Sequence, residues 1–443
     1  MKKLFIKTHG CQMNFYDSEK MVDLLKPHGY QIDENPENAD IIVINTCHIR
    51  EKAVEKTYSE LGRIRDQVML RKEKTGKKTI VAVAGCVAQA QGKEIMKRSP
   101  WVDIVVGPQS YQNLPELIAK VDPLTKNNHI NIEFPTVPKF DHLKSIVTER
   151  GPSAFLTIQE GCDKFCAFCV VPYTRGAEYS RPIKSILDEA KELIDNGVKE
   201  ITLLGQNVNA WHAEWKDKKV WGLGRLIKEL SKIKELEFIR YTTSHPLDMD
   251  LELIEAHRDV SKLMPYLHLP IQSGSDNILR SMNRKHTVKE YIKVIEKVRH
   301  YNPNIALSGD FIVGFPGETD KDFLETLQLV KDIKYGQSYS FKYSSRPGTP
   351  AANREEVCES LKKDRLAELQ LLLSKQQMDI QKSMIGKEVK VLFEKPGRLN
   401  NQMGGKSEYL HAVHVIGSSL KKGDIKSVKI INTEANSLGG VLI

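Results

Sequence analysis

Three cysteines lie within eight residues of one another in the segment GCDKFCAFC. They are Cys162, Cys166 and Cys169, called here the loop cysteine set, and the aromatic residue Phe168 precedes the last of them. Thiolates with the spacing C-x3-C-x2-C can hold one soft metal centre. A closed structural zinc site uses four ligands, and so does a ferredoxin-type [4Fe–4S] segment. Three thiolates on a [4Fe–4S] cube leave one iron free to chelate a substrate. A zinc site with a distant fourth ligand and unrelated structural cysteines are the alternatives.

Three further cysteines each follow an apolar segment. They are Cys11 in KLFIKTHGC, Cys47 in IIVINTC and Cys86 in TIVAVAGC, called here the N-terminal cysteine set. Such segments are typical of buried parallel strands, whose carboxyl ends lie along one edge of an open sheet, where ligands bind. The three thiols could therefore meet at one point. The alternative is three unrelated buried residues, because a free cysteine often belongs to the core.

The remaining composition favours a soluble enzyme with reduced thiols. The seventh cysteine, Cys358, follows no predicted strand and is interpreted as a small helix residue without a role. An odd number of cysteines argues against a disulfide framework. The start MKKLFIKTHGC has too short an apolar run for a signal peptide, and no stretch is long enough to span a bilayer. We expect a cytosolic location.

Positive charge permits a nucleic-acid partner without requiring one. The formal net charge is +9, which a basic enzyme with no polyanionic partner would also have. Basic residues spread along the C-terminal tail suit phosphate contacts, which position a nucleic acid without reading its sequence. The alternative is a solvated face. These residues are Lys387, Lys390, Lys395, Arg398, Lys406, Lys421, Lys422, Lys426 and Lys429.

The length of 443 residues suggests about three domains, and the N-terminal one alternates strands with helices. A helix from Asp17 or Ser18 to near Gly29 and another over residues 50–64 fit between the strands. This βαβα order predicts an open, mostly parallel sheet in a domain over residues 1–122. Residues 123–152 carry prolines among polar residues and are predicted to be a linker. The predicted strands are residues 3–7, 41–46, 79–85 and 101–107.

A second alternating series begins at Ala154. Six βα units suit a barrel or partial barrel over residues 153–384, with function at the carboxyl ends of its strands. A long helical pattern over residues 354–384 follows the last unit, and short strands at 388–395, 410–417 and 425–435 predict a small β-barrel over 385–443. The predicted barrel strands are residues 154–159, 200–205, 238–243, 266–270, 305–315 and 338–343.

The cysteine loop, its aromatic residue, the preceding strand and the following βα series resemble the radical S-adenosylmethionine (SAM) superfamily. THGCQMNFYDSE, INTCHIREKAVEK, VAGCVAQAQG, VVPYTRG, YTTSHP, MNRKHT and FKYSSRPGTPA extend the resemblance over the whole chain to its methylthiotransferase family. This resemblance implies an α/β protein with a doubly wound N-terminal domain, a (β/α)6 partial barrel and a TRAM-like barrel. It implies a [4Fe–4S] cluster that binds SAM on the loop cysteine set, and a second [4Fe–4S] cluster on the N-terminal set.

The motifs GCQMN, VVPYTRG and SHP most resemble the bacterial branch that methylthiolates C2 of N6-isopentenyladenosine at tRNA position 37. The hydrogen on C2 belongs to an unactivated C–H bond, which no side-chain base can usefully break. The resemblance implies that SAM yields a carbon radical and that the second cluster carries the sulfur. The implied partners are the tRNA anticodon stem-loop and an electron-donor protein. The alternatives are a methylthiotransferase for threonylcarbamoyl-adenosine tRNA or a ribosomal-protein aspartate, a two-cluster electron carrier, and a zinc-dependent RNA-binding protein.

Further site residues follow from their positions and from the family pattern. GFPGET lacks the Lys-Ser/Thr of a P-loop and is interpreted as a turn that opens the next helix. Expected around SAM are Phe168, with its backbone at the adenine, Gly205, Gln206 and Asn207 at the amino acid moiety, and Ser244, Gln272, Arg284 and Asp310, which could otherwise be ordinary polar rim residues. Expected near the target nucleotide, or as supports for the site, are Gln12, Asn14, His48, Arg50, Tyr173 and, foremost, Arg175.

Overall fold

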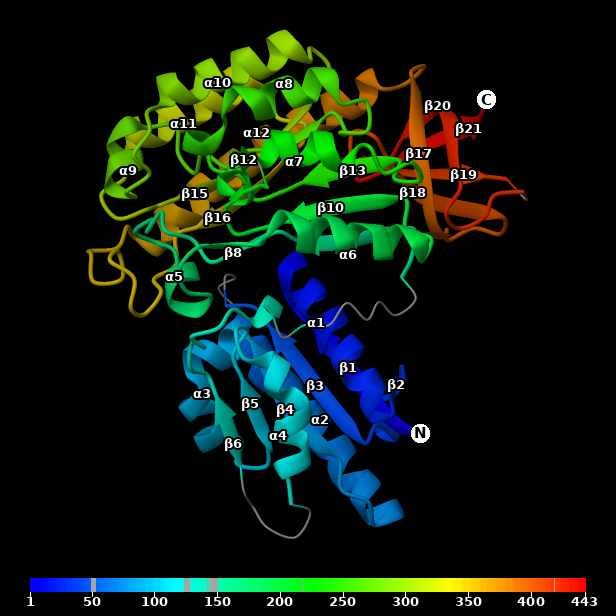
Figure 1. The fold of residues 1–443 in the computed structure, drawn as a ribbon. Coiled ribbons are helices and arrows are strands. Elements are labelled where there is room, and N and C mark those ends of the chain that lie inside the picture. Colours follow the sequence, from blue (N-terminus) through cyan, green and yellow to red (C-terminus); the bar gives the residue numbers. More distant parts are fainter. Residues whose placement is uncertain (49–52, 123–127, 142, 144–149, 217, 418) are drawn as a thin grey trace. The chain divides into compact units, whose positions relative to one another are not determined.

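The computed structural model describes residues 1–48, 53–122, 128–141, 143, 150–216, 218–417 and 419–443 (Figure 1). The chain forms two compact units. Unit 1 consists of the described residues of Met1–Thr148, Glu160–Asp163 and Cys169–Tyr179. Unit 2 consists of the described residues of Glu149–Gln159, Lys164–Phe168 and Ser180–Ile443.

Unit 1 is built on a six-stranded parallel sheet in the order β2-β1-β3-β4-β5-β6. Strand β3 is buried at every position because helices cover both faces of the sheet. Its alternate residues belong to two apolar clusters, one shared with α1 and α4 and the other with α2 and α3. The sheet is therefore doubly wound, as expected. The elements are β1 (Lys2–Thr8), α1 (Gln12–Leu25), β2 (Tyr30–Ile32), β3 (Ile41–Thr46), α2 (Ala53–Thr75), β4 (Ile80–Gly85), α3 (Cys86–Arg98), β5 (Ile104–Val106), α4 (Leu114–Lys120), β6 (His129–Asn131) and α5 (Val171–Thr174).

Unit 1 differs from the sequence-based expectation at two places. Helix α1 begins directly after Cys11, so the predicted start at Asp17 or Ser18 was wrong. Those two side chains do not cap a helix because both make buried tertiary contacts; Ser18, for example, hydrogen-bonds to Thr8. The other difference is β6, which lies inside the stretch expected to be a linker and pairs with β5. Part of that stretch therefore belongs to the folded sheet.

Unit 2 contains six parallel strands that follow one another in chain order, in the sheets β7-β10-β13 and β14-β15-β16. An isolated parallel bridge joins Ile239 at the edge of the first sheet to Leu263. Each predicted strand is present, which confirms the partial barrel. The elements are β7 (Ser153–Thr157), α6 (Ile183–Asp195), β10 (Glu200–Leu204), β11 (His212–Glu214), β12 (Val220–Gly222), α7 (Leu223–Leu230), β13 (Phe238–Tyr241), α8 (Leu251–Asp259), β14 (Tyr266–His268), α9 (Asp276–Ser281), α10 (Val288–Tyr301), β15 (Ala306–Val313), α11 (Asp320–Ile333), β16 (Gln337–Lys342) and α12 (Glu359–Ser383). The two-residue strands β8 (Gln159–Glu160) and β9 (Tyr179–Ser180) each have one residue assigned to either unit.

Two local predictions in unit 2 have different outcomes. GFPGET is the expected turn, because Thr319 caps α11 in a capping box with Asp322. The Gly314 amide also donates to Glu318 across this turn. Cys358, in contrast, is not a helix residue: it is the exposed N-cap of α12, and its thiol contacts Ser360.

The C-terminal part of unit 2 is a closed five-stranded barrel in the order β17-β18-β19-β21-β20, which confirms the predicted small barrel. Its core includes Val391, Phe393 and Val428. The sequence patterns missed β18 and β21 because each contains a glycine pair that interrupts the alternation of apolar and polar side chains. Among the described residues, no helix combines the length and apolar character needed to cross a bilayer. The strands are β17 (Glu388–Pro396), β18 (Gln402–Ser407), β19 (Ala412–Ile416), β20 (Ile425–Thr433) and β21 (Leu438–Leu442).

Candidate metal centres at the two cysteine sets

The N-terminal cysteine set lies at the carboxyl edge of the sheet in unit 1. The neighbouring strands β1, β3 and β4 end at Thr8, Thr46 and Gly85, and a cysteine follows each within three residues. Cys11 is the N-cap of α1, and Cys86 is the first residue of α3. The positive ends of two helix dipoles therefore favour thiolates at this edge.

The three thiols of the N-terminal set lie close enough to influence one another. A hydrogen bond with Cys47 is the main cause that lowers the pKa of Cys11 to about 6, against the effect of burial. Burial raises the pKa of Cys86, and the nearby Cys11 raises it further. The structure thus brings together three cysteines that are distant in sequence, and such a donor set fits a soft metal centre.

Two glycines allow the cysteines to approach one another. Gly10 and Gly85 have φ angles of +126° and +89°, which side-chain-bearing residues rarely adopt. A Cβ atom on Gly10 would lie 2.1 Å from Cβ of Cys47, and one on Gly85 would lie 2.4 Å from Oδ1 of Asn45. The backbone before Cys11 and Cys86 therefore packs directly against the end of β3.

We expect Gly10→Ala to displace Cys47 and to reduce the iron that the N-terminal set retains. The clash and the strained backbone should each cost about 1–3 kcal/mol. The measurement is iron and sulfide per chain after anaerobic reconstitution. Gly29→Ala is the matched control, because Gly29 also has a positive φ, of +81°, but nothing lies within 4 Å of the added Cβ. Iron content equal to that of the wild type in Gly10→Ala would contradict the prediction.

Four charged side chains form a buried network in unit 1, and each is at most 3% exposed. Arg175 binds Asp17 at 2.7 Å and Glu160 at 2.5 Å. Lys139 binds the same two carboxylates, at 3.3 Å and 2.8 Å. Burial disfavours the charge of Arg175, yet Asp17, Cys86 and Glu160 raise its pKa well above the ordinary value. Arg175 is therefore a buried cation beside the N-terminal cysteine set.

The residues expected near the target nucleotide differ from one another in how far they are buried. The Asn14 side chain is buried and donates to Asn45 and to the Thr46 carbonyl, and it accepts from the Cys11 thiol at 3.1 Å. The burial of Asn14 and Arg175 favours the alternative of a supporting role for both. Arg50 lies outside the described residues. Gln12 and Tyr173 are exposed, whereas His48 is 7% exposed.

The loop cysteine set is divided between the units: Cys162 and Cys169 belong to unit 1, and Cys166 belongs to unit 2. Within unit 2, the Arg284 guanidinium lies 3.6 Å from the buried Cys166 sulfur. In the described parts of the chain, no three Cys, His, Asp or Glu side chains converge as ligands of a single metal ion. A [4Fe–4S] cube does not need such convergence, since each thiolate binds an iron at a different corner.

Several residues expected around SAM lie at the carboxyl ends of strands in unit 2. Gly205, Gln206 and Asn207 directly follow β10, and the Gln159 side chain accepts hydrogen bonds from the amides of Gln206 and Asn207. The Arg284 side chain is anchored on the Pro270 carbonyl at 2.5 Å. Of the remaining four, Ser244 and Gln272 follow β13 and β14, Asp310 lies within β15, and Phe168 is half-buried.

Some of these residues, and two histidines of unit 2, carry buried polar atoms that have no hydrogen-bond partner in the described part of the chain. Such atoms are rare in folded proteins and indicate a ligand or ordered water. Two residues with such atoms, His245 and His286, were not predicted as site residues from the sequence, although both lie in the family motifs YTTSHP and MNRKHT. Burial and the charge of Arg284 lower the pKa of both imidazoles, that of His286 to about 4. A polar cofactor such as SAM fits this donor and acceptor set. The atoms are Asn207 Oδ1, Ser244 Oγ, His245 Nε2, Arg284 Nε and His286 Nε2.

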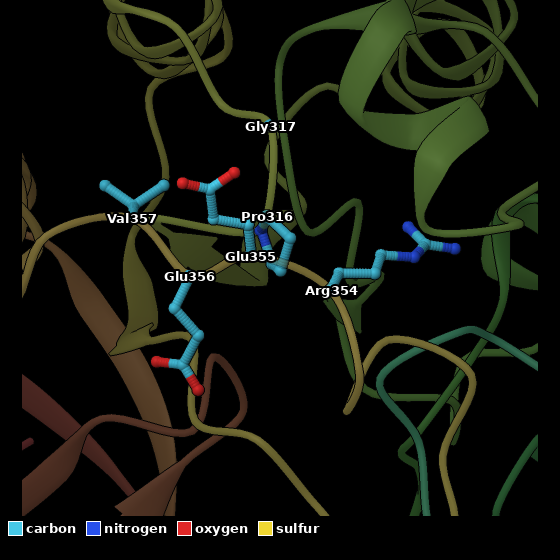
Figure 2. A pocket seen from close by; sticks show the side chains of 6 residues that line it. All are labelled: Pro316, Gly317, Arg354, Glu355, Glu356 and Val357. Atoms are coloured by element: carbon cyan, nitrogen blue, oxygen red, sulfur yellow. The ribbon is translucent and has the colours of Figure 1, made fainter.

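A cavity of about 440 Å³ in unit 2 involves neither cysteine set (Figure 2). Arg354 and Glu356 at its edge point in different directions and are already bound, to Ser281 and Lys362. The cavity is therefore not a candidate for the chemistry expected from the cysteines. It is lined by Pro316, Gly317, Arg354, Glu355, Glu356 and Val357.

Family models and solved structures that resemble this chain agree with the fold of the two units and with the cysteine loop. The family model described as "Radical SAM superfamily" matches residues 156–330, and "Uncharacterized protein family UPF0004" matches residues 3–107. The fold also resembles the radical SAM methyltransferase TsrM from Kitasatospora setae, with a TM-score of 0.56 and 12% identity over 80% of this chain and 77% of that one. Fold and cysteine loop thus define a radical SAM protein.

Curated relatives narrow this class to one family. The relative from Ruegeria sp. (strain TM1040) is 58% identical over 100% of this chain and 99% of its own length. Those from Paracoccus denitrificans and Agrobacterium fabrum are 56% and 54% identical, over 97% and 96% of their lengths and 100% and 99% of this chain. All three are named tRNA-2-methylthio-N(6)-dimethylallyladenosine synthase. The chain belongs to the tRNA-2-methylthio-N(6)-dimethylallyladenosine synthase family.

Proposed function

We propose that this protein transfers a methylthio group to C2 of N6-isopentenyladenosine at position 37 of tRNA. Full-length identity of 54–58% to the curated synthases supports this substrate. The single structural observation that carries the proposal is the meeting of Cys11, Cys47 and Cys86 at one sheet edge. A zinc-dependent RNA-binding protein would not need this second thiol set, and a two-cluster electron carrier would not need a barrel as large as that of unit 2.

Radical SAM enzymes use a [4Fe–4S] cluster and SAM, and we assign the cluster to Cys162, Cys166 and Cys169. When bound, this pair supplies one-electron cleavage of SAM, which general acid–base chemistry cannot replace at an unactivated C–H bond. We assign a second cluster, with sulfur for transfer, to the N-terminal cysteine set. An electron-donor protein and a cytosolic location remain predictions.

The chain's own residues would bind and orient the cofactor. Asn207, Ser244 and Arg284 present buried polar atoms for which a SAM amino acid moiety is a suitable partner. Arg284 lies beside Cys166, so its charge would stabilise a thiolate ligand there. His245 and His286 would remain neutral at physiological pH because their pKa values are lowered, and they would act as hydrogen-bonding groups.

The function is tested with anaerobically reconstituted protein, a reductant and SAM. Matched tRNA substrates carry isopentenyladenosine, threonylcarbamoyl-adenosine or unmodified adenosine at position 37, and a ribosomal protein is the fourth substrate. We expect mass spectrometry of the nucleosides to detect methylthiolation on the isopentenylated tRNA. Product on another substrate alone would replace the assignment, and reversible electron transfer without SAM cleavage would favour a carrier. Two [4Fe–4S] clusters correspond to about eight iron atoms per chain.

The C-terminal barrel is our proposed contact for the tRNA backbone. Eight of the nine basic residues of the tail are exposed, and the ninth, Lys406, is ion-paired with Glu394 at 2.9 Å. We expect Lys421→Ala/Lys422→Ala to weaken tRNA binding and to reduce the slope of log affinity against log salt by about one for each phosphate that is no longer neutralised. Lys289→Ala/Lys293→Ala, on the exposed face of α10, is the matched control. Equal salt slopes in both double variants would exclude these phosphate contacts.

A further inference from the structure

Asn207 and Asn209 lie in one short turn after β10 but use their carboxamides differently. The side chain of Asn209 is satisfied at both ends, because Nδ2 donates to the His245 carbonyl at 2.9 Å and Oδ1 accepts from the His245 amide at 2.8 Å. The side chain of Asn207 is satisfied only at Nδ2, which donates to Oδ2 of Asp248 at 2.8 Å. Its Oδ1 meets no donor among the described residues, although Asn207 is only 2% exposed. Asn207 therefore keeps one buried acceptor for a ligand.

Asp248 determines which way the Asn207 carboxamide faces. An ionised carboxylate only accepts hydrogen bonds, so the NH2 group of Asn207 must point toward it and the oxygen must point elsewhere. The other oxygen of the same carboxylate, Oδ1, binds Nζ of Lys164 at 2.8 Å. Lys164 lies between Cys162 and Cys166 in the sequence. One carboxylate thus joins the segment that carries Cys166 to the turn that carries Asn207.

Backbone contacts hold the two turns together. The turn with Asn207 follows β10, and the turn with Asp248 follows β13, the neighbouring strand of the same sheet. The Val208 amide donates to the Thr243 carbonyl at 2.9 Å, in addition to the two bonds of Asn209. Thr243 has a φ of +68°, which is a strained conformation for a β-branched residue. Such strain is concentrated at functional sites, where the surrounding structure enforces it.

The groups around this turn match the two charged ends of an amino acid. Oδ1 of Asn207 is an acceptor for an amino group, and Nε of Arg284 is a donor for a carboxylate. The Arg284 guanidinium also lies 3.6 Å from the Cys166 sulfur. Through Nδ1, His286 donates to the Arg284 carbonyl at 3.0 Å, and its ring lies 5.5 Å from that of His245. SAM carries both of these groups on its amino acid moiety.

We propose that Asp248 is a positioning residue for SAM. It holds the Asn207 carboxamide so that Oδ1 faces the ligand and accepts a hydrogen bond from the α-amino group. The ion pair with Lys164 ties the cysteine loop to the same carboxylate. Asp248 itself does not touch the cofactor. This inference rests on the proposed function in one respect, the assignment of the SAM amino acid moiety to Asn207.

The test measures ligand discrimination in the anaerobically reconstituted full chain, without reductant. Equilibrium dialysis gives the dissociation constants of SAM and of the SAM analogue that lacks the α-amino group, and the ratio of analogue to SAM reports what that group contributes. Asn207→Ala should reduce this ratio about tenfold, because one hydrogen bond to the amino group is lost. Asp248→Ala should reduce it about two- to tenfold, because the freed Asn207 side chain must then be immobilised during binding.

The double variant distinguishes positioning from structural damage. If Asp248 acts only through Asn207, Asn207→Ala/Asp248→Ala should have the same ratio as Asn207→Ala alone, since the effects of coupled residues do not add. Additive losses would overturn the inference. If Asp248→Ala retains no iron, Asp248→Asn decides. This variant keeps the size of the side chain but offers Asn207 a donor as well as an acceptor, so we expect a reduced ratio there too.

Asp250→Ala is the matched control. Asp250 lies two residues further along the chain, and its carboxylate caps α8 by accepting from the Leu253 amide at 2.7 Å. Its loss should leave the ratio unchanged, and an equal reduction there would overturn the inference. An unchanged ratio in Asp248→Ala beside a reduced one in Asn207→Ala would refute the positioning role. An unchanged ratio in Asn207→Ala would instead refute the placement of the amino acid moiety, so the two failures are distinguishable.

Discussion

Replacing Cys162 with alanine should abolish SAM cleavage. Two thiolates would remain in the loop set, too few to hold a [4Fe–4S] cube with a single open iron. Since enzymes accelerate their reactions by about a millionfold or more, loss of the cofactor should leave no 5′-deoxyadenosine above the uncatalysed background. The measurement is chromatography of 5′-deoxyadenosine and methionine after anaerobic reduction, together with an iron content that falls from about eight to about four per chain.

Cys358→Ala is the matched control for this experiment. Cys358 is the exposed N-cap of α12, and its thiol contacts Ser360. Loss of this thiol should change neither the iron content nor SAM cleavage. Cleavage at the wild-type rate in Cys162→Ala would remove this cysteine from the cluster and leave the zinc interpretation to be tested by metal analysis.

Replacing Cys47 with alanine should separate the two chemical steps. SAM cleavage should persist, because the loop set is untouched, while methylthio insertion into isopentenylated tRNA should fall below detection. Cys47 is 3% exposed and hydrogen-bonds to Cys11, so its loss removes a thiol from the middle of the set. Both products can be quantified in one reaction, as 5′-deoxyadenosine and as the methylthiolated nucleoside.

Val43→Ala tests whether damage to β3 alone would have the same effect. Val43 is fully buried in the strand that leads to Cys47 but carries no ligand atom. This truncation should destabilise unit 1 by about 1–3 kcal/mol and still give the methylthiolated product at moderate temperature. Wild-type methylthiolation by Cys47→Ala would refute the second cluster, whereas equal loss in both variants would indicate only a folding defect.

Residue order along the chain was enough to predict the features that depend on local structure. The spacing of Cys162, Cys166 and Cys169 is a property of one short loop. Apolar runs that end in Cys11, Cys47 and Cys86 located strand ends, since buried parallel strands have a compositional signature. The turn GFPGET, which opens α11, and the six barrel strands are equally local signals. This is why the fold class could be predicted, and why the two cysteine sets could be proposed as metal ligands.

Side chains whose partners are distant in sequence could be assigned a role only from the folded chain. Arg175 and Asp17 are 158 residues apart, and Lys139 comes from a stretch that resembled a linker. A charged residue in a polar motif is consistent with a nucleotide contact and with a buried ion pair, and sequence patterns do not distinguish them. Strand β6 could also be recognised only from the folded chain, because its three residues are too few to show a periodicity. So could the proximity of His245 and His286, whose rings lie 5.5 Å apart. Their burial and pairing arise from long-range packing, which no local pattern records.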